Sequence, residues 1–302
     1  MIIDIRYHIV SLVAVFLALG LGILIGTAAL GERVLVQEQN RLIERLESDV
    51  TRLTNERRDL QRELSQERAA LRQADRFGRE VLPYLVADRL YGKQVAVIRL
   101  SPAPESRPGV DELQAVLRRA GAEVTTSLAF LEDPVQMDAS HRAGVARILG
   151  VADPAAEGLP VETLRGIARE LARGAPTLLT SYLVDAEMVA VTGGTKAPAQ
   201  VAVIVGGAAN EARAESVRTL DLPLIDALRG AGLTVAVVET TDVAVSLIKH
   251  YRTKGVLTVD NIDTPAGQVA LVMGLAMGKT GNYGVKETAR QLLPVTGEAS
   301  LP

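Results

Sequence analysis

The chain has 302 residues, which is enough for about two domains of ordinary size. Hydrophobic residues make up 48% and charged residues 23%, values typical of globular proteins, so wholesale disorder is excluded. The net charge of -3 is spread along the chain, and no nucleic acid is expected as a partner. Without cysteine, the chain has no disulfide, catalytic thiol or thiolate metal site.

Residues 9–30 carry no charge and predict a transmembrane helix surrounded by membrane lipid. About 20 helical residues cross the hydrocarbon layer of a bilayer. A cleaved signal peptide has an apolar region of only about 7 to 15 residues, so a retained anchor is favoured. The alternatives are a cleaved signal peptide and a buried soluble helix. We assign residues 1–31 to an N-terminal tail and this helix.

Small residues recur every four positions on one face of the predicted anchor: Ala14, Ala18, Gly22 and Gly26. Small side chains let a second helix backbone approach closely, so this face is predicted to support dimerisation. The alternative is the ordinary composition of membrane helices, which are often rich in small residues.

The two flanks of the anchor give conflicting indications of its orientation. Arg6 precedes it, whereas Arg33, Arg41 and Arg45 follow it, and a bare count favours a cytoplasmic C-terminal part. Long domains translocate largely regardless of charge, and a short tail before one anchor is typical of a signal-anchor. We therefore expect a single-pass cell-membrane protein with a cytoplasmic N-terminus and the rest extracytoplasmic.

Residues 32–80 have the composition of a long helix, with 11 Arg, 11 acidic residues and no Lys. Apolar residues recur with a seven-residue period, interrupted by Arg57 and Glu67. The first position of the repeat (a) holds Val36, Ile43, Val50, Leu64 and Leu71, and the fourth (d) holds Leu46, Leu53 and Leu60. This pattern predicts a parallel homodimeric coiled coil, in which Glu63 can meet Arg68 of the partner helix. The alternative is one amphipathic helix packed on its own domain.

Gly78, Pro83 and Gly92 are expected to end the long helix, with a linker over residues 81–92. After it, residues 93–302 alternate apolar runs with helical stretches, which predicts an open, mostly parallel α/β domain. The segment QVAVI occurs at residues 94–98 and again at 200–204. Similar helices follow both copies, so we expect a βαβ duplication with halves at about 93–197 and 198–302.

Candidate sites are few in this domain. The pair Gly206-Gly207 follows a predicted strand where a phosphate loop could lie, but no full nucleotide-binding motif is present, so a turn is favoured. Residues 265–278 predict a buried helix capped by Thr264, with Met273 and Met277 four residues apart. Their thioethers are weak candidates for Cu(I), with core filling favoured. We expect no catalytic site and no cofactor.

Asp260, Asn261 and Asp263 precede that helix. We favour turn and capping hydrogen bonds for these three residues over a cation site.

Two long segments carry a resemblance to a known family. RYHIVSLVAVFLALGLGILIGT near the N-terminus and TVDNIDTPAGQVALVMGLAMGKTGNYG near the C-terminus, with the heptad helix between, resemble the MctB family of copper transport proteins. The resemblance implies membrane residence, a role in copper homeostasis or transport across the cell envelope, and for some members an outer-membrane channel. Copper is implied by this resemblance only.

The residues themselves are hard to reconcile with a channel or a copper centre. One helix per chain cannot enclose a pore. Copper sites normally use Cys, His or Met clusters, and this chain has three His and five Met. The alternative function is a non-catalytic, dimeric, membrane-tethered scaffold that docks an envelope or division partner.

Overall fold

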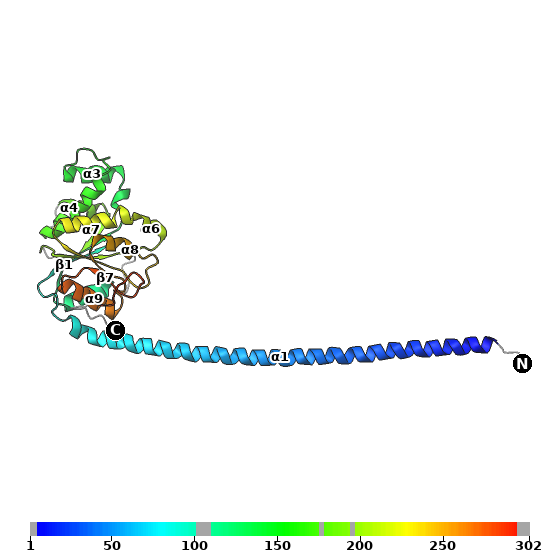
Figure 1. The fold of residues 1–302 in the computed structure, drawn as a ribbon. Helices are drawn as coiled ribbons and strands as arrows, with labels where there is room; N and C mark the ends of the chain where they lie inside the picture. The colour runs from blue at the N-terminus through cyan, green and yellow to red at the C-terminus, as the bar shows by residue number, and fades with distance from the viewer. Residues whose placement is uncertain (1–4, 101–109, 175–177, 194–196, 295–302) are drawn as a thin grey trace. The chain divides into compact units, whose positions relative to one another are not determined.

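A computed structural model describes residues 5–100, 110–174, 178–193 and 197–294, except for the side chains of residues 5, 28–38, 40 and 110. The chain divides into two units, residues 1–72 and 73–302. The first consists of the greater part of one helix, α1 (Ile5–Val86), and the second is an α/β domain that includes the end of that helix (Figure 1).

The predicted anchor is helical, and Arg6–Thr27 is long and apolar enough to cross a membrane. Among the described residues it is the one segment that meets this description. Further along α1, charged side chains pair within the helix. Arg52 contacts Asp49 at 3.0 Å and Glu56 at 3.5 Å, and Arg62 contacts Asp59 at 3.0 Å.

The α/β domain is built on one seven-stranded sheet with the order β3-β2-β1-β4-β5-β6-β7. All neighbouring strands are parallel except β3, which runs antiparallel to β2. The strands are β1 (Gln94–Arg99), β2 (Glu123–Phe130), β3 (Val189–Thr192), β4 (Val201–Val205), β5 (Thr234–Val238), β6 (Leu257–Val259) and β7 (Gly281–Tyr283). The predicted open, mostly parallel sheet is confirmed.

Helices cover both faces of the sheet (Figure 1). The α-helices after α1 are α2 (Val110–Arg119), α3 (Ala139–Leu149), α4 (Leu159–Arg173), α5 (Leu178–Asp185), α6 (Glu211–Glu215), α7 (Asp221–Gly230), α8 (Ile248–Tyr251) and α9 (Pro265–Ala276). The described residues also form the short 3-10 helices η1 (Pro134–Gln136), η2 (Ser216–Arg218) and η3 (Arg252–Lys254).

Alternation along each strand divides the core between these two faces. In β1, Ala96 and Ile98 join the core under α3, α4, α5, α7 and α8, whereas Val95 and Val97 face the other side. That second core is formed with α2, α9 and the end of α1. Strands buried on both faces require continuous apolar runs, which is why these segments could be recognised in the sequence.

The two QVAVI segments lie side by side at the centre of the sheet. Val95 pairs with Val201 and Ile98 with Ile204, so the repeated residues are in parallel register. The elements β1-α2-β2 and β4-α7-β5 then extend to opposite sides. The two halves differ after these elements. In the first half, β2 is followed by η1, α3, α4, α5 and the antiparallel strand β3. In the second half, β5 is followed by α8, η3 and the parallel strand β6. A duplication remains a proposal that this register supports.

The expected helix break at Gly78 and Pro83 is wrong, because α1 continues through both residues to Val86. The reason is burial: Leu82 and Val86 are 5% and 0% exposed in the second core. Gly78 lies against α9, since a Cβ added there would be 3.0 Å from Pro265 Cβ. Tertiary packing thus overrides the local preference of both residues, and part of the expected linker is core.

Candidate functional site

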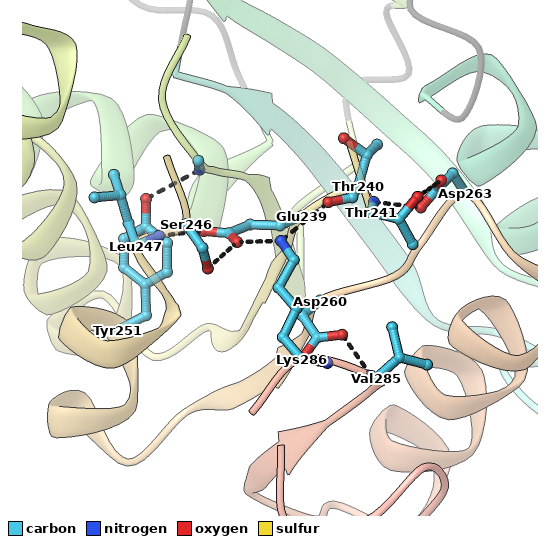
Figure 2. Close-up of polar contacts among 11 residues, drawn as sticks. Glu239, Thr240, Thr241, Ser246, Leu247, Tyr251, Asp260, Asp263, Val285 and Lys286 are labelled. Atoms are coloured by element: carbon cyan, nitrogen blue, oxygen red, sulfur yellow. Dashed lines mark hydrogen bonds and ion pairs between the residues drawn. The ribbon is translucent and has the colours of Figure 1, made fainter. Parts of the chain in front are cut away.

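The carboxyl ends of the parallel strands meet at one edge of the sheet, the usual location of ligand sites in open α/β folds. Here β4 runs into Gly206 and Gly207, β5 into Glu239 and β6 into Asp260. Figure 2 shows the polar side chains at this carboxyl edge. This is therefore the first place to look for function in the domain.

Glu239 is completely buried at the end of β5. Its Oε1 accepts a hydrogen bond from Leu247 N at 2.7 Å, and its Oε2 accepts one from Ser246 Oγ at 2.6 Å. Lys286 Nζ lies 3.1 Å from the same Oε2 and completes the set (Figure 2). Because the burial of a charge is costly, these donors are what permit a carboxylate here.

Lys286 reaches Glu239 because Asp260 fixes the backbone of the segment after β7. Asp260 accepts hydrogen bonds from Val285 N at 2.8 Å and Lys286 N at 3.1 Å. Gly284 has φ +139, and a Cβ there would overlap the Asp260 carboxylate, so only glycine fits. Lys286 Nζ also donates to Thr240 O at 3.1 Å. The segment after β7 is therefore attached to the ends of β5 and β6.

A second buried cluster joins α7, α8 and the arginine of α6. Asp221 is fully buried, accepts a hydrogen bond from Tyr251 OH at 2.5 Å and pairs with Arg213 Nη2 at 2.7 Å. Burial raises the pKa of Asp221, although the charge of Arg213 opposes the rise. Burial, followed by the charge of Asp221, also raises the pKa of Tyr251 well above its usual value.

Tyr251 also occupies the place where a phosphate loop could bind a ligand. Gly207 N donates to Tyr251 OH at 3.3 Å, and a Cβ at Gly206 would be 2.8 Å from that oxygen. The glycine pair thus makes room for a tyrosine of the same chain. This contact agrees with the interpretation of the pair as a turn.

The loop before α9 makes the capping bonds that its residue types favour. Thr264 Oγ1 accepts from Gly267 N at 3.2 Å as the N-cap, and Asn261 Nδ2 donates to Thr264 Oγ1 at 3.0 Å. Asp263 accepts from Thr241 N at 2.8 Å and from the Thr241 hydroxyl. The N-cap at Thr264 is confirmed and Asn261 bonds within the loop, whereas Asp260 and Asp263 accept hydrogen bonds from distant segments, at residues 285–286 and 241, and cap no helix.

The carboxylates of the carboxyl edge are thus engaged by donors of the protein itself. Within the described residues, no group of three or more His, Asp or Glu side chains is arranged to hold a metal ion. A buried network in which every polar group has a hydrogen-bond partner makes the structure around it rigid. This network fixes the strand ends and the segment after β7 in one conformation. A spatial cluster that sequence reasoning missed therefore has a structural role. The signal that could have found it is Glu239, a carboxylate directly after the apolar run at residues 235–238.

The soft-donor candidates lie away from this edge. Met273 and Met277 are at the end of α9 and both are partly exposed, with Met273 packed against the second core. Their four-residue spacing places them on one face of the helix, as expected. Whether they bind copper stays a hypothesis.

The candidate dimerisation residues all lie in α1, although the side chain of Val36 is outside those described. Those in the anchor are exposed or, for Gly26, partly exposed. The described large residues of the heptad seam are 45 to 69% exposed in the single chain: Ile43, Leu46, Val50, Leu53, Leu60, Leu64 and Leu71.

The structure thus defines a protein with one N-terminal helix fit to cross a membrane and an α/β domain whose strand ends are fixed by its own side chains. A family profile described as copper transport outer membrane protein, MctB, matches residues 2–294. The chain belongs to this family.

Named relatives agree with that assignment. The chain is 26% identical to "Copper transporter MctB" of Mycobacterium bovis (strain ATCC BAA-935 / AF2122/97). It is equally similar to the protein of that name from Mycobacterium tuberculosis (strain ATCC 25618 / H37Rv). Both alignments cover 93% of this chain and 96% of the relative. Both relatives are named as copper transporters.

Proposed function

We propose that this chain serves copper homeostasis at the cell envelope as a non-catalytic, membrane-anchored protein. The observation that carries the proposal is family membership over residues 2–294, which includes the anchor, the heptad segment and the α/β domain. The helix Arg6–Thr27 supplies the membrane attachment. In the proposed orientation the N-terminus is cytoplasmic and the domain extracytoplasmic.

A copper-sensitivity assay tests the role itself. Cells that lack the chain should accumulate copper and grow poorly in medium that contains copper. Expression of the full chain should restore their growth. A variant in which a charged-residue segment replaces residues 9–26 should fail to restore it. Unchanged copper content in the deleted cells would remove the proposal. Protease accessibility of the domain in spheroplasts tests the orientation.

Direct contact with copper is a narrower proposal, for which Met273 and Met277 supply the donor pair. Soft thioethers suit Cu(I), and both side chains are accessible in part. Titration of the detergent-purified full chain with Cu(I) against a chromogenic chelator should show binding that Met273→Leu with Met277→Leu abolishes. The matched control replaces Met137 and Met188, which are buried, with leucine. No binding by the unaltered chain would contradict direct metal handling.

The second candidate function is a dimeric tether that holds the α/β domain at a distance from the bilayer for an envelope or division partner. The specific observation in its favour is the exposed heptad seam, beside which Arg52 and Arg62 pair within their own helix. Burying this seam against a second copy would remove large apolar side chains from water. The small-residue face of the anchor would extend the same contact into the membrane.

Single cysteines test the tether, because the natural chain has none. Val50→Cys and Leu53→Cys should each give disulfide-linked dimers in membranes, since a and d residues face their counterparts in a parallel pair. Arg58→Cys, outside the seam, is the control. Absence of dimers from both seam variants, together with a monomeric sedimentation profile, would contradict the tether. A tagged pull-down from membranes would then identify any further partner.

A further inference from the structure

The sheet has a topological switch point between its two central strands, β1 and β4. From β1 the chain proceeds through α2 to β2, whereas from β4 it proceeds through α7 to β5 on the opposite side. In open α/β sheets, ligands bind in the crevice outside the carboxyl ends of the strands at such a point. The network around Glu239 and Lys286 lies at the ends of β5 and β6, so a different set of residues surrounds the end of β1.

A cavity of about 250 Å³ lies beside the end of β1. It is lined by the residue directly after β1, by the segment after β2, and by residues of α6 and η2 that follow β4. Its apolar lining includes Leu100, Phe130, Leu131 and Leu220. Pockets for drug-sized ligands measure about 300–1,000 Å³, so this cavity suits a smaller molecule.

The cationic group of the cavity is the guanidinium of Arg213, from α6. Its Nε and Nη2 donate to Leu100 O at 3.3 and 3.1 Å, and Nη2 also pairs with Asp221 Oδ1 at 2.7 Å. Its Nη1 is buried and has no hydrogen-bond partner among the described residues. A buried donor without an acceptor is costly. The guanidinium is therefore held in place by the chain and can still take a further acceptor, such as a carboxylate.

Two acidic residues after β2 line the same cavity. Glu132 is exposed, and no described residue donates a hydrogen bond to its carboxylate. Asp133 accepts from Val135 N at 2.9 Å through Oδ1. Burial and, to a smaller degree, the charge of Asp133 raise the pKa of Asp221, which agrees with a position of Asp133 near the pair of Asp221 and Arg213. Since Asp221 already compensates Arg213, the lining has an excess of negative charge.

We propose that this cavity binds a small zwitterion, an α-amino acid with an apolar side chain. Its ammonium group pairs with Glu132 and Asp133, its carboxylate with the guanidinium of Arg213, and its side chain contacts the apolar lining. A simple anion would meet the two acidic residues, and a simple amine would leave Arg213 without its further acceptor. Both charged groups of the ligand are therefore needed. The proposal depends neither on copper nor on dimerisation.

Calorimetric titration of the detergent-purified full chain compares three probes of similar shape. These are L-leucine, isoamylamine, which lacks the carboxylate, and isocaproate, which lacks the amine. L-Leucine should bind, and both analogues should bind about tenfold or more weakly, because each loses hydrogen bonds to a charged group. No binding of L-leucine at millimolar concentration would overturn the proposal. An analogue that binds as tightly as L-leucine would overturn the zwitterion as the ligand class.

Substitutions in the lining locate the binding. Glu132→Gln should weaken L-leucine binding by about tenfold, and the exposed position makes misfolding no concern. Glu123→Gln is the matched control, since Glu123 is exposed at the opposite end of β2. Arg213→Lys keeps a charge beside Asp221 and should weaken L-leucine while leaving isoamylamine unchanged, whereas general disruption of the cavity would weaken both. Unchanged affinity in Glu132→Gln, or an equal loss in Glu123→Gln, would contradict this site.

Discussion

Lys286 Nζ lies 3.1 Å from Glu239 Oε2 and thereby links the segment after the last strand to the end of β5. Glu239 is fully buried, and the Lys286 side chain is 21% exposed. The pair is therefore shielded from the solvent screening that makes surface ion pairs weak.

Removing the lysine leaves the buried carboxylate short of a partner. We expect Lys286→Met to lower the free energy of unfolding by about 3–5 kcal/mol, the usual cost of breaking a buried pair on one side. Pulse proteolysis of the full chain in urea measures this loss. Lys286→Met combined with Glu239→Gln should recover part of it, because no unpaired charge then stays buried. A single variant as stable as the unaltered chain would contradict the role assigned to this pair.

Tyr251 makes the free energy of unfolding of the domain depend on pH in the alkaline range. Its pKa is raised in the folded chain, so the unfolded chain, with an ordinary phenol pKa of about 10, loses this proton first. The stability from Tyr251 is complete below pH of about 10 and is lost as the pH rises from there toward the folded pKa.

Tyr251→Phe should remove that loss, and it should cost about 1–2 kcal/mol at neutral pH because Asp221 loses a hydrogen bond. Urea unfolding at neutral pH and above pH 10 measures both effects. Tyr91→Phe, at an exposed position, is the control. A variant whose alkaline stability declines as steeply as that of the unaltered chain would contradict the assignment.

Gly284 is predicted to be irreplaceable. Alanine there would combine φ +139 with a Cβ overlapping Asp260, the residue that fixes the backbone of Lys286. Gly284→Ala should destabilise the domain by more than about 3 kcal/mol, whereas Gly278→Ala should cost only about 1–2 kcal/mol. At Gly278 φ is +60 and a Cβ would meet nothing within 4 Å. Equal effects of the two substitutions in thermal unfolding would show that the contact with Asp260 is unimportant.

The end of α1 is predicted to be required for the α/β domain. A fragment of residues 73–302 should be folded and resistant to protease, whereas residues 93–302 should not be. The shorter fragment loses Leu82, Val86 and Leu90, all in the second core. In the longer fragment, Leu82→Ala should cost about 2–5 kcal/mol. Tyr84→Ala, at an exposed position of the same helix, is the control that should leave the stability of the fragment unchanged. A stable fragment 93–302 would refute this boundary.

The sequence was sufficient where the pattern is local. Continuous apolar runs such as 201–205 predicted strands, and Thr264 before Pro265 predicted the start of α9. The predicted helix end at Gly78 and Pro83 was wrong. Glycine and proline disfavour a helix in an isolated chain, but the burial of Leu82 and Val86 decides that this helix continues. The pair of Glu239 and Lys286 was also out of reach. The two residues meet only after the sheet has placed β5, β6 and β7 side by side.

The burial of α1 against α2 and α9 affects the order in which the protein can mature. The anchor and the rest of α1 leave the ribosome first, yet Leu82 and Val86 find their α9 neighbours only after almost the entire polypeptide has been made. Until then these side chains lack their α9 neighbours, and chaperones that bind exposed apolar surface would protect them.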